Sequence, residues 1–190
     1  YCGYLPQYIS IFLTILTSAL SDQNASIKQA SAYGLGVLCS TTPSEVIQPH
    51  LNNIIDLLKQ EIRNTSNNHD NTMLQSARDN MIAALGRIAK FQQQDQLWSI
   101  WVSYLPLQYD VAEGPSTYSQ LLTLCSSVQH QSFIMEQQVH IFKVLLHIFG
   151  HDDWYHDQES TLFNTLRSMT LNYQSNGQLQ TIVNTLDIKY

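Results

Sequence analysis

The sequence predicts an all-α fold, a right-handed α-solenoid of about four stacked helix pairs, from three observations. Apolar residues recur at helical spacing along almost the whole 190-residue chain. Only 7 Gly and 5 Pro interrupt them, and no segment alternates apolar and polar residues as a strand would. Residues 27–38 and 77–88 resemble one another in sequence. An internal repeat of this kind indicates a stack of similar units rather than one closed globule.

The first half of the chain is expected to contain four helices. Their apolar residues lie within 5–20, 25–40, 46–62 and 72–91. A polar turn at 21–24 separates the first two helices, and Pro43 suits the first turn of the third, where its missing N–H costs nothing. These helices form two pairs, over about 4–40 and 43–91.

The second half is expected to contain two more pairs, over about 95–128 and 131–173, and a short terminal helix over 178–188. Pro106 ends the fifth helix, and residues 107–115 form an acidic loop. Gly150 is expected to cap the seventh helix. We expect the whole chain, 1–190, to form one solenoid segment.

The repeat places small residues at matched positions. Gly36 corresponds to Gly86, and Lys28 corresponds to Arg78. Glycine inside a helix lowers helix stability by about 1 kcal/mol relative to Ala. Its recurrence at matched positions therefore indicates a packing requirement. We therefore expect Gly36 and Gly86 to lie where one helix approaches the next closely.

The composition disfavours several classes of function. A net charge of -6 repels phosphates, so direct binding to nucleic acid is not expected, and basic partners are favoured. No apolar run approaches the length of about 20 residues that a membrane helix needs. Cys2, Cys39 and Cys125 form no Cys-x-x-Cys pair and are expected to be reduced thiols, as in a cytosolic or nuclear protein.

Two sets of residues are candidate contact sites. On the inner helices these are Lys28, Arg78, Asp79, Asn80 and Arg87. They could contact a partner, or they could form a structural ladder in which Asp79 or Asn80 joins neighbouring helices. The second set is Trp98 and Trp101, three positions apart, which could line a partner-binding groove or pack in the core.

No catalytic activity is expected from the sequence. No nucleophile elbow, phosphate-binding loop or dinucleotide fingerprint occurs, so we predict no catalytic residue, no cofactor and no enzyme. One cluster has metal-like composition: His147, His151, His156, Asp152, Asp153 and Asp157. Gly150 separates the first two histidines and no Glu follows the first, so a solvated acidic loop is predicted there instead of a metal site.

Three blocks carry a family resemblance. The helix pairs with Lys28, Leu35-Gly36, Arg78 and Leu85-Gly86 resemble HEAT repeats. Residues 32–37 (Ala-Tyr-Gly-Leu-Gly-Val), 77–88 and 101–107 (Trp-Val-Ser-Tyr-Leu-Pro-Leu) follow in the order of blocks in the importin-beta superfamily of nuclear transport receptors. Asp110, Glu113, Tyr118 and Leu121-Leu122 come after them as in that family. The likeness covers about residues 25–124 and is nearest to the C-terminal repeats of importin-5-type receptors, with importin-4-type receptors next.

The resemblance implies transport rather than catalysis. Such receptors bind protein cargo, here expected to carry basic signals, and FG-nucleoporins, and they release cargo when Ran-GTP binds. The main Ran-GTP site would lie in N-terminal repeats beyond this chain, which starts at Tyr1 and reads as part of a longer receptor. The implied location is the cytoplasm, the nucleus and the nuclear pore. A HEAT-repeat scaffold outside transport is the alternative, and a zinc-dependent enzyme is a third class.

Overall fold

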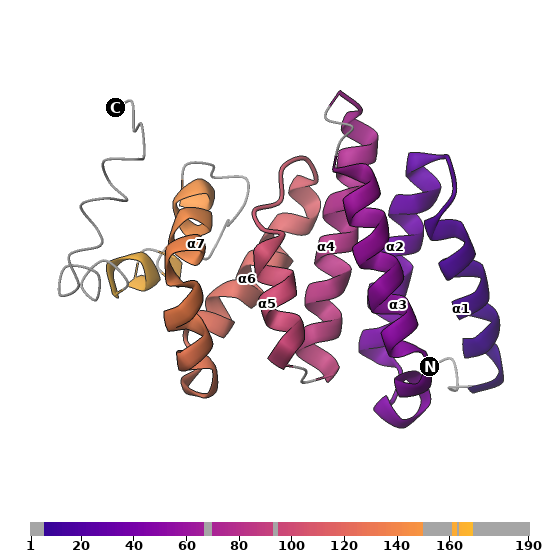
Figure 1. The fold of residues 1–190 in the computed structure, drawn as a ribbon, viewed down its shortest axis with the longest axis horizontal. Helices are drawn as coiled ribbons and strands as arrows, with labels where there is room; N and C mark the ends of the chain where they lie inside the picture. Colours follow the sequence, from indigo (N-terminus) through magenta and orange to yellow (C-terminus); the bar gives the residue numbers. More distant parts are fainter. Residues whose placement is uncertain (1–5, 67–69, 93–94, 150–160, 163, 169–190) are drawn as a thin grey trace. The chain divides into compact units, whose positions relative to one another are not determined.

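A computed structural model describes residues 6–66, 70–92, 95–149, 161–162 and 164–168 (Figure 1). Within these ranges all regular structure is helical, and the all-α prediction is confirmed for them. The α-helices are α1 (Pro6–Leu20), α2 (Ala25–Thr41), α3 (Ser44–Thr65), α4 (Thr72–Gln92), α5 (Asp95–Ser103), α6 (Gly114–Cys125) and α7 (Gln131–Phe149). Two short 3-10 helices, η1 (Val111–Glu113) and η2 (Val128–His130), lie among them.

The chain divides into two compact units, Tyr1–Glu113 and Gly114–Tyr190. One continuous solenoid segment over 1–190 stays a prediction, and the boundary between the two units falls inside its third expected pair, 95–128. The physical reason lies in the segment after α5, because that segment returns to α4 and η1 packs on α4. Helix α5 and its following loop therefore belong to the first unit.

The first unit contains two antiparallel helix pairs, α1–α2 and α3–α4 (Figure 1). Helix α1 packs on α2, and α3 packs on α4. The most extensive packing between the pairs joins α2 to α4, and α1 also contacts α3. Helices α2 and α4 are therefore the inner members expected from the repeat, and α1 and α3 are the outer ones.

Local sequence explains where these helices begin. The Asn24 side chain accepts the Ser26 backbone N–H at 2.9 Å and caps α2. The Asn71 side chain accepts the Leu74 N–H at 3.0 Å just before α4. Pro43 immediately precedes α3, one position earlier than predicted. Helix α5 ends at Ser103, two residues before the cis Leu105–Pro106 bond.

Helix α4 forms the centre of the first unit. Its residues from Met81 to Gly86 are all buried, as are three of its polar side chains, Gln75, Asp79 and Asn80. Helices α2, α3 and α5 and the 3-10 helix η1 surround it. Polar groups buried in such a position need hydrogen-bond partners, and these partners define the candidate site described below.

The close approach predicted at Gly36 is confirmed. A Cβ atom built on Gly36 would lie 3.1 Å from Ala84 Cα and 3.3 Å from Arg87 Cδ, both on α4. Gly34 faces the other way, where a Cβ would lie 3.0 Å from the Leu16 Cδ2 atom of α1. Gly86 is buried in α4. The small residues of α2 therefore allow α4 to pack closely on one side of the helix and α1 on another.

The second unit contains α6, η2, α7 and helical residues at 161–162 and 164–168. Helix α6 begins at Gly114 and ends at Cys125, where 116–128 was expected. The Ser126 N–H binds the Leu122 carbonyl and the Ser127 N–H binds that of Leu124, which closes the helix. The expected cap at Gly150, the acidic loop at 151–157 and the terminal helix at 178–188 lie outside the described residues.

Candidate functional site

Asp79 on α4 holds the segment that follows α5. Its side chain is buried, and one carboxylate oxygen, Oδ2, accepts three backbone N–H bonds. The donors are Gln108 at 2.8 Å, Tyr109 at 2.6 Å and Asp110 at 3.0 Å. Burial raises the pKa of Asp79, and these three bonds and the charge of Arg78 oppose that rise. Asp79 therefore acts as an internal anchor for the loop rather than as an exposed contact.

Asp110 in this loop joins both inner helices. Its carboxylate accepts a hydrogen bond from the Asn80 side chain of α4 and another, at 2.8 Å, from the Gln29 side chain of α2. The same side chain accepts the Ala112 N–H at 3.1 Å. The structural ladder that the sequence suggested for Asp79 and Asn80 thus runs through an acidic residue that neither the repeat nor helical spacing identified.

Arg87 forms the next step along α4. Its guanidinium makes an ion pair with Glu113 of η1 and lies 5.1 Å from the ring centre of Tyr33 on α2. Burial raises the pKa of Glu113, and the nearby Arg87 charge opposes that rise. Arg87 thus has two partners within the unit, while its Nη1 atom is buried without a hydrogen-bond partner. The Tyr33 side chain is 50% exposed.

Lys28 makes a buried contact between the two helix pairs, which is the ladder alternative given above for the inner-helix residues. Its side chain is buried, and its ammonium group forms an ion pair with Glu61 of α3. It also donates to the Leu20 carbonyl at 2.9 Å. Glu61 accepts a further bond from Ser21 at 3.2 Å. Lys28 therefore ties the first helix pair to the second and does not line an open face.

Arg78 lies differently from Lys28, its counterpart in the repeat. It lines a pocket of about 280 Å³ with Gln75, Tyr104, Pro106 and Tyr109, among others. Its Nη1 atom is 3.9 Å from Asp79 Oδ1, and its Nε is buried without a hydrogen-bond partner. Arg78 therefore lines a pocket and is only partly paired within the unit.

The tryptophan pair is in the core. Trp101 is fully buried and Trp98 is 7% exposed, and their rings meet edge to face at 5.5 Å between centres. This edge-to-face geometry is favourable for two aromatic rings. The idea that Trp98 and Trp101 line an open groove does not fit this burial, and core packing accounts for both.

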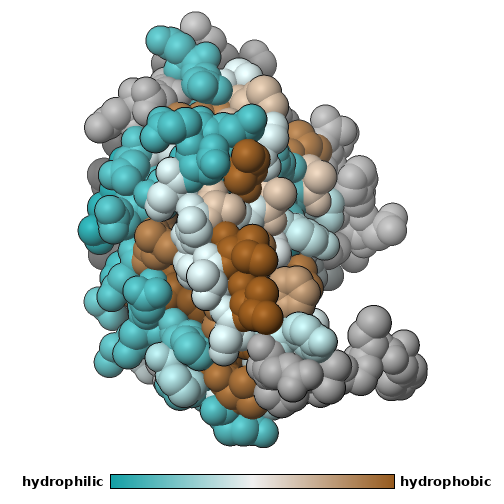
Figure 2. Space-filling model, turned by 90° about the vertical axis from the view of Figure 1, so that its right-hand side faces the viewer, coloured by the Kyte–Doolittle hydropathy of each residue, from teal (hydrophilic) through white to brown (hydrophobic). Residues whose placement is uncertain are grey.

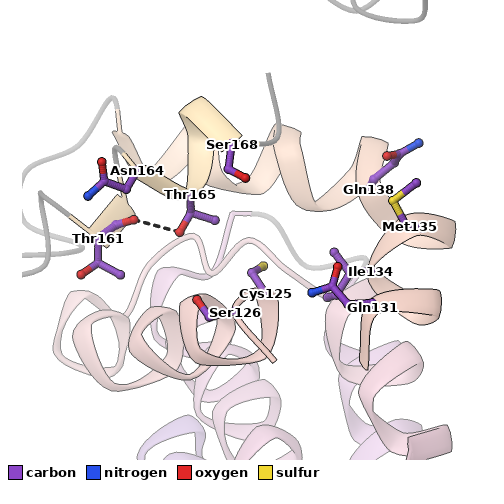
Figure 3. Close-up of a pocket in the computed structure, with 10 residues that line it drawn as sticks. All are labelled: Cys125, Ser126, Gln131, Ile134, Met135, Gln138, Thr161, Asn164, Thr165 and Ser168. Carbon is purple, nitrogen blue, oxygen red and sulfur yellow. Dashed lines mark hydrogen bonds between the residues drawn. The ribbon is translucent and has the colours of Figure 1, made fainter. Parts of the chain in front are cut away.

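The second unit has a pocket of about 370 Å³ near the end of α6 (Figure 3). Cys125 and Ser126 line one side of it, and four residues of α7 and four of the helical residues at 161–168 complete it. Its lining is mainly hydroxyl, amide and aliphatic. Burial raises the pKa of Cys125 to about 12, so this thiol stays protonated at neutral pH and is a poor nucleophile.

The described residues contain no group of three or more His, Cys, Asp or Glu side chains placed to hold a metal ion. The histidines and aspartates of the segment 151–157 lie outside them. Among the helices that the structure describes, none is both long enough and apolar enough to cross a lipid bilayer.

Sequence reasoning missed three members of this arrangement. Gln29, Glu61 and the exposed ring of Tyr33 each contribute a contact, yet none was singled out. Glu61 stands at an inward position of an otherwise apolar helix face, between Leu58 and Ile62, and that placement of a charge was the available signal. The partner of Gln29 is 81 positions away and leaves no local signal.

No protein-family model matches the chain. Over 73% of its length, the chain is 32% identical to a protein described as a probable importin-5 homolog from Dictyostelium discoideum. The chain spans 13% of the length of that protein. This similarity supports a place in the importin-beta family and does not distinguish an importin-5 type within it.

Proposed function

We propose that this chain is a segment of a nuclear transport receptor of the importin-beta family, and that it serves protein binding rather than catalysis. The observation that carries the proposal is the 32% identity to the probable importin-5 homolog, which extends over 73% of the chain. The pairing of α1–α2 with α3–α4 agrees with the HEAT-repeat stack that such a receptor would contain.

The proposed mechanism is reversible binding by a stack that can change its curvature. Each contact between helix pairs is a small hinge, and many small rotations add up to a large change of shape. In the first unit, two contacts set the geometry of such a hinge. They are the close approach of Gly36 to Ala84 and the buried ion pair of Lys28 with Glu61.

The proposed partners are protein cargo with basic signals, FG-nucleoporins and Ran-GTP. The net charge of -6 supports basic cargo, because an acidic surface attracts Lys-rich segments at long range. Release by Ran-GTP would involve repeats beyond this chain. The corresponding location is the cytoplasm, the nucleus and the nuclear pore, and an importin-5-type receptor is the finer assignment that we favour.

Affinity capture tests this function. The full-length parent protein is immobilised and exposed to a nuclear and cytoplasmic extract, with excess Ran-GTP in one arm and Ran-GDP in the control arm, and bound proteins are identified by mass spectrometry. The proposal expects FG-nucleoporins, together with basic proteins that leave in the Ran-GTP arm alone. Capture of a stable complex indifferent to the nucleotide would instead identify a scaffold outside transport.

A further inference from the structure

Helix α1 and the pocket beside Arg78 present surfaces of opposite character within the first unit. Helix α1 contains no Asp, Glu, Lys or Arg, and Figure 2 views the face where it lies, with hydrophobic residues gathered in a vertical column. The pocket beside Arg78, about 280 Å³ in volume, is lined mainly by polar residues. They include Gln75 of α4, Tyr104 after α5, and Gln108 and Tyr109 of the following loop. We call it the Arg78 pocket, and its lining indicates a polar ligand.

Arg78 gives this pocket its charge. Among the described residues that line the pocket, Arg78 carries the one charged side chain. The acidic group paired with it is Asp79, whose Oδ1 atom lies 3.9 Å from Arg78 Nη1, farther than a hydrogen bond reaches. Asp79 is buried, and its Oδ2 atom is bound to the backbone N–H groups of the loop after α5. The positive charge of Arg78 is therefore only partly balanced within the unit.

The guanidinium of Arg78 also has an unused hydrogen-bond donor. Its Nε atom is buried without a hydrogen-bond partner, and the side chain as a whole is 17% exposed. A guanidinium carries five N–H donors and no acceptor, and buried donors in folded proteins are almost always paired. A negatively charged acceptor forms the strongest hydrogen bonds with such a donor. The chemistry of Arg78 therefore matches an anionic ligand.

The walls of the Arg78 pocket are held in place by hydrogen bonds. The Gln75 side chain donates to the Thr65 carbonyl at 2.9 Å, which fixes one wall to the end of α3. On the other side, Asp79 accepts the backbone N–H groups of Gln108 at 2.8 Å and Tyr109 at 2.6 Å. A site whose walls are already fixed loses little conformational entropy when a ligand binds. The loop anchored by Asp79 thus also shapes a preformed site.

We infer that the Arg78 pocket binds the carboxylate of an Asp or Glu side chain on a protein partner. The planar fork of a guanidinium matches a carboxylate through two parallel N–H···O bonds. Tyr104 and Tyr109, the latter 38% exposed, add aromatic surface beside Arg78, and Tyr and Arg are enriched among the anchor residues of protein interfaces. The inference goes beyond the proposed function, which names basic cargo, because this pocket selects negative charge.

Photo-cross-linking to the full-length parent tests the inference. The probe is a short, otherwise neutral peptide with one Glu beside a diazirine cross-linker, and the control probe carries Gln in its place. Mass spectrometry quantifies the labelling of peptides that contain residues 75–78 and 103–109, which line the pocket. We expect the Glu probe to label them about tenfold more than the Gln probe, because hydrogen bonds to a charged group are the stronger ones.

The variants assign this preference to the pocket. Arg78→Gln should remove it, whereas the matched control Arg167→Gln, at an exposed arginine of the second unit, should leave it unchanged. Gln108→Glu covers the case in which Arg78→Gln does not fold. Gln108 is exposed, so this variant adds a negative charge at the pocket without altering α4, and it should also abolish the preference. Arg78→Lys keeps the charge without the planar fork and should retain part of it.

Three results would overturn the inference. Equal labelling by the two probes in the unchanged protein would mean that the pocket does not select a carboxylate. A preference for Glu that survives Arg78→Gln and Gln108→Glu would assign it to other residues. If sodium acetate competes as well as the unlabelled Glu peptide at equal concentration, the pocket takes free anions instead of a protein side chain. Because the experiment uses purified parent without cargo or Ran, its result is independent of the transport proposal.

Discussion

Asp79 of α4 and Asp110 of the loop after α5 bind each other's segments through hydrogen bonds. The Asp79 carboxylate accepts the Asp110 backbone N–H at 3.0 Å, while the Asp110 carboxylate accepts side-chain bonds from α2 and α4. Two acidic residues can lie this close because their charges are directed at different donors. The loop after α5 is thereby built into the stack of helices.

Replacing Asp79 should loosen this loop. Asp79→Ala removes the acceptor of three backbone N–H groups, and we expect a loss of about 1–3 kcal/mol in the free energy of unfolding. Asp79→Asn keeps an acceptor oxygen and should cost less. Urea unfolding at pH 7 measures both, with Asp56→Ala as the control, because Asp56 makes an exposed ion pair with Lys59. An Asp79→Ala midpoint equal to that of the control would contradict the anchoring role.

Gly36 and Gly34 should respond differently to the same substitution. A Cβ at Gly36 would press on the Ala84 backbone, so Gly36→Ala should destabilise despite the gain in helix propensity, and Gly36→Leu should cost about 1–3 kcal/mol. A Cβ at Gly34 would meet only the flexible end of Leu16, so Gly34→Ala should be neutral or stabilising by up to about 1 kcal/mol.

Thermal melting compares the two glycine variants, and Gly36→Ala combined with Ala84→Gly checks the mechanism. The double variant removes the Ala84 Cβ, which lies 3.2 Å from the position of the added methyl group, and it should regain part of the lost stability. If Gly36→Ala and Gly34→Ala melt at the same temperature, the close approach of α2 to α4 does not limit packing.

The buried ion pair should be costly to break from one side. Lys28→Met leaves the Glu61 carboxylate buried without its cation, and we expect a loss of about 3–5 kcal/mol. Lys28→Met with Glu61→Leu replaces both charges by apolar groups and should recover most of that loss. Denaturant unfolding of the two variants and of the unchanged protein measures these differences. If Lys28→Met is as stable as the unchanged protein, the ion pair does not stabilise the fold.

Glu113 should give the protein a distinctive pH dependence. Burial raises its pKa in the folded state above the unfolded value of about 4.3, so its contribution to stability is fully present below that value and is lost as pH rises through the folded pKa. Glu113→Gln has no proton to exchange at this position. The stability of the unchanged protein relative to Glu113→Gln should therefore fall as pH is raised from about 4 to 7, in urea unfolding at fixed ionic strength. A relative stability that rises over this interval would show the opposite shift.

The helical layout was accessible from sequence because it depends on local information. Apolar spacing located α2 and α4, and the recurrence of small residues identified the close approach at Gly36. Both signals are carried by residues within one helix, and helix geometry converts their spacing into a shared face.

The partners of the charged residues were not accessible in the same way. Lys28 and Arg78 occupy equivalent positions in the repeat, yet Lys28 meets Glu61 on α3, whereas Arg78 lines a pocket. The contacts of each cation depend on which helix packs beside it in the folded chain. Only the three-dimensional packing brings Gln29 and Asp110, 81 positions apart, to one hydrogen bond.

The most direct test of the account is the affinity of the purified full-length parent for a fluorescent Lys-rich cargo peptide, measured by anisotropy at two salt concentrations with Ran-GTP or Ran-GDP. We expect binding that weakens as salt is raised and that is lost with Ran-GTP but kept with Ran-GDP. Binding that is the same with either nucleotide, or no binding of basic peptides at low salt, would contradict the proposal that this chain belongs to a nuclear transport receptor.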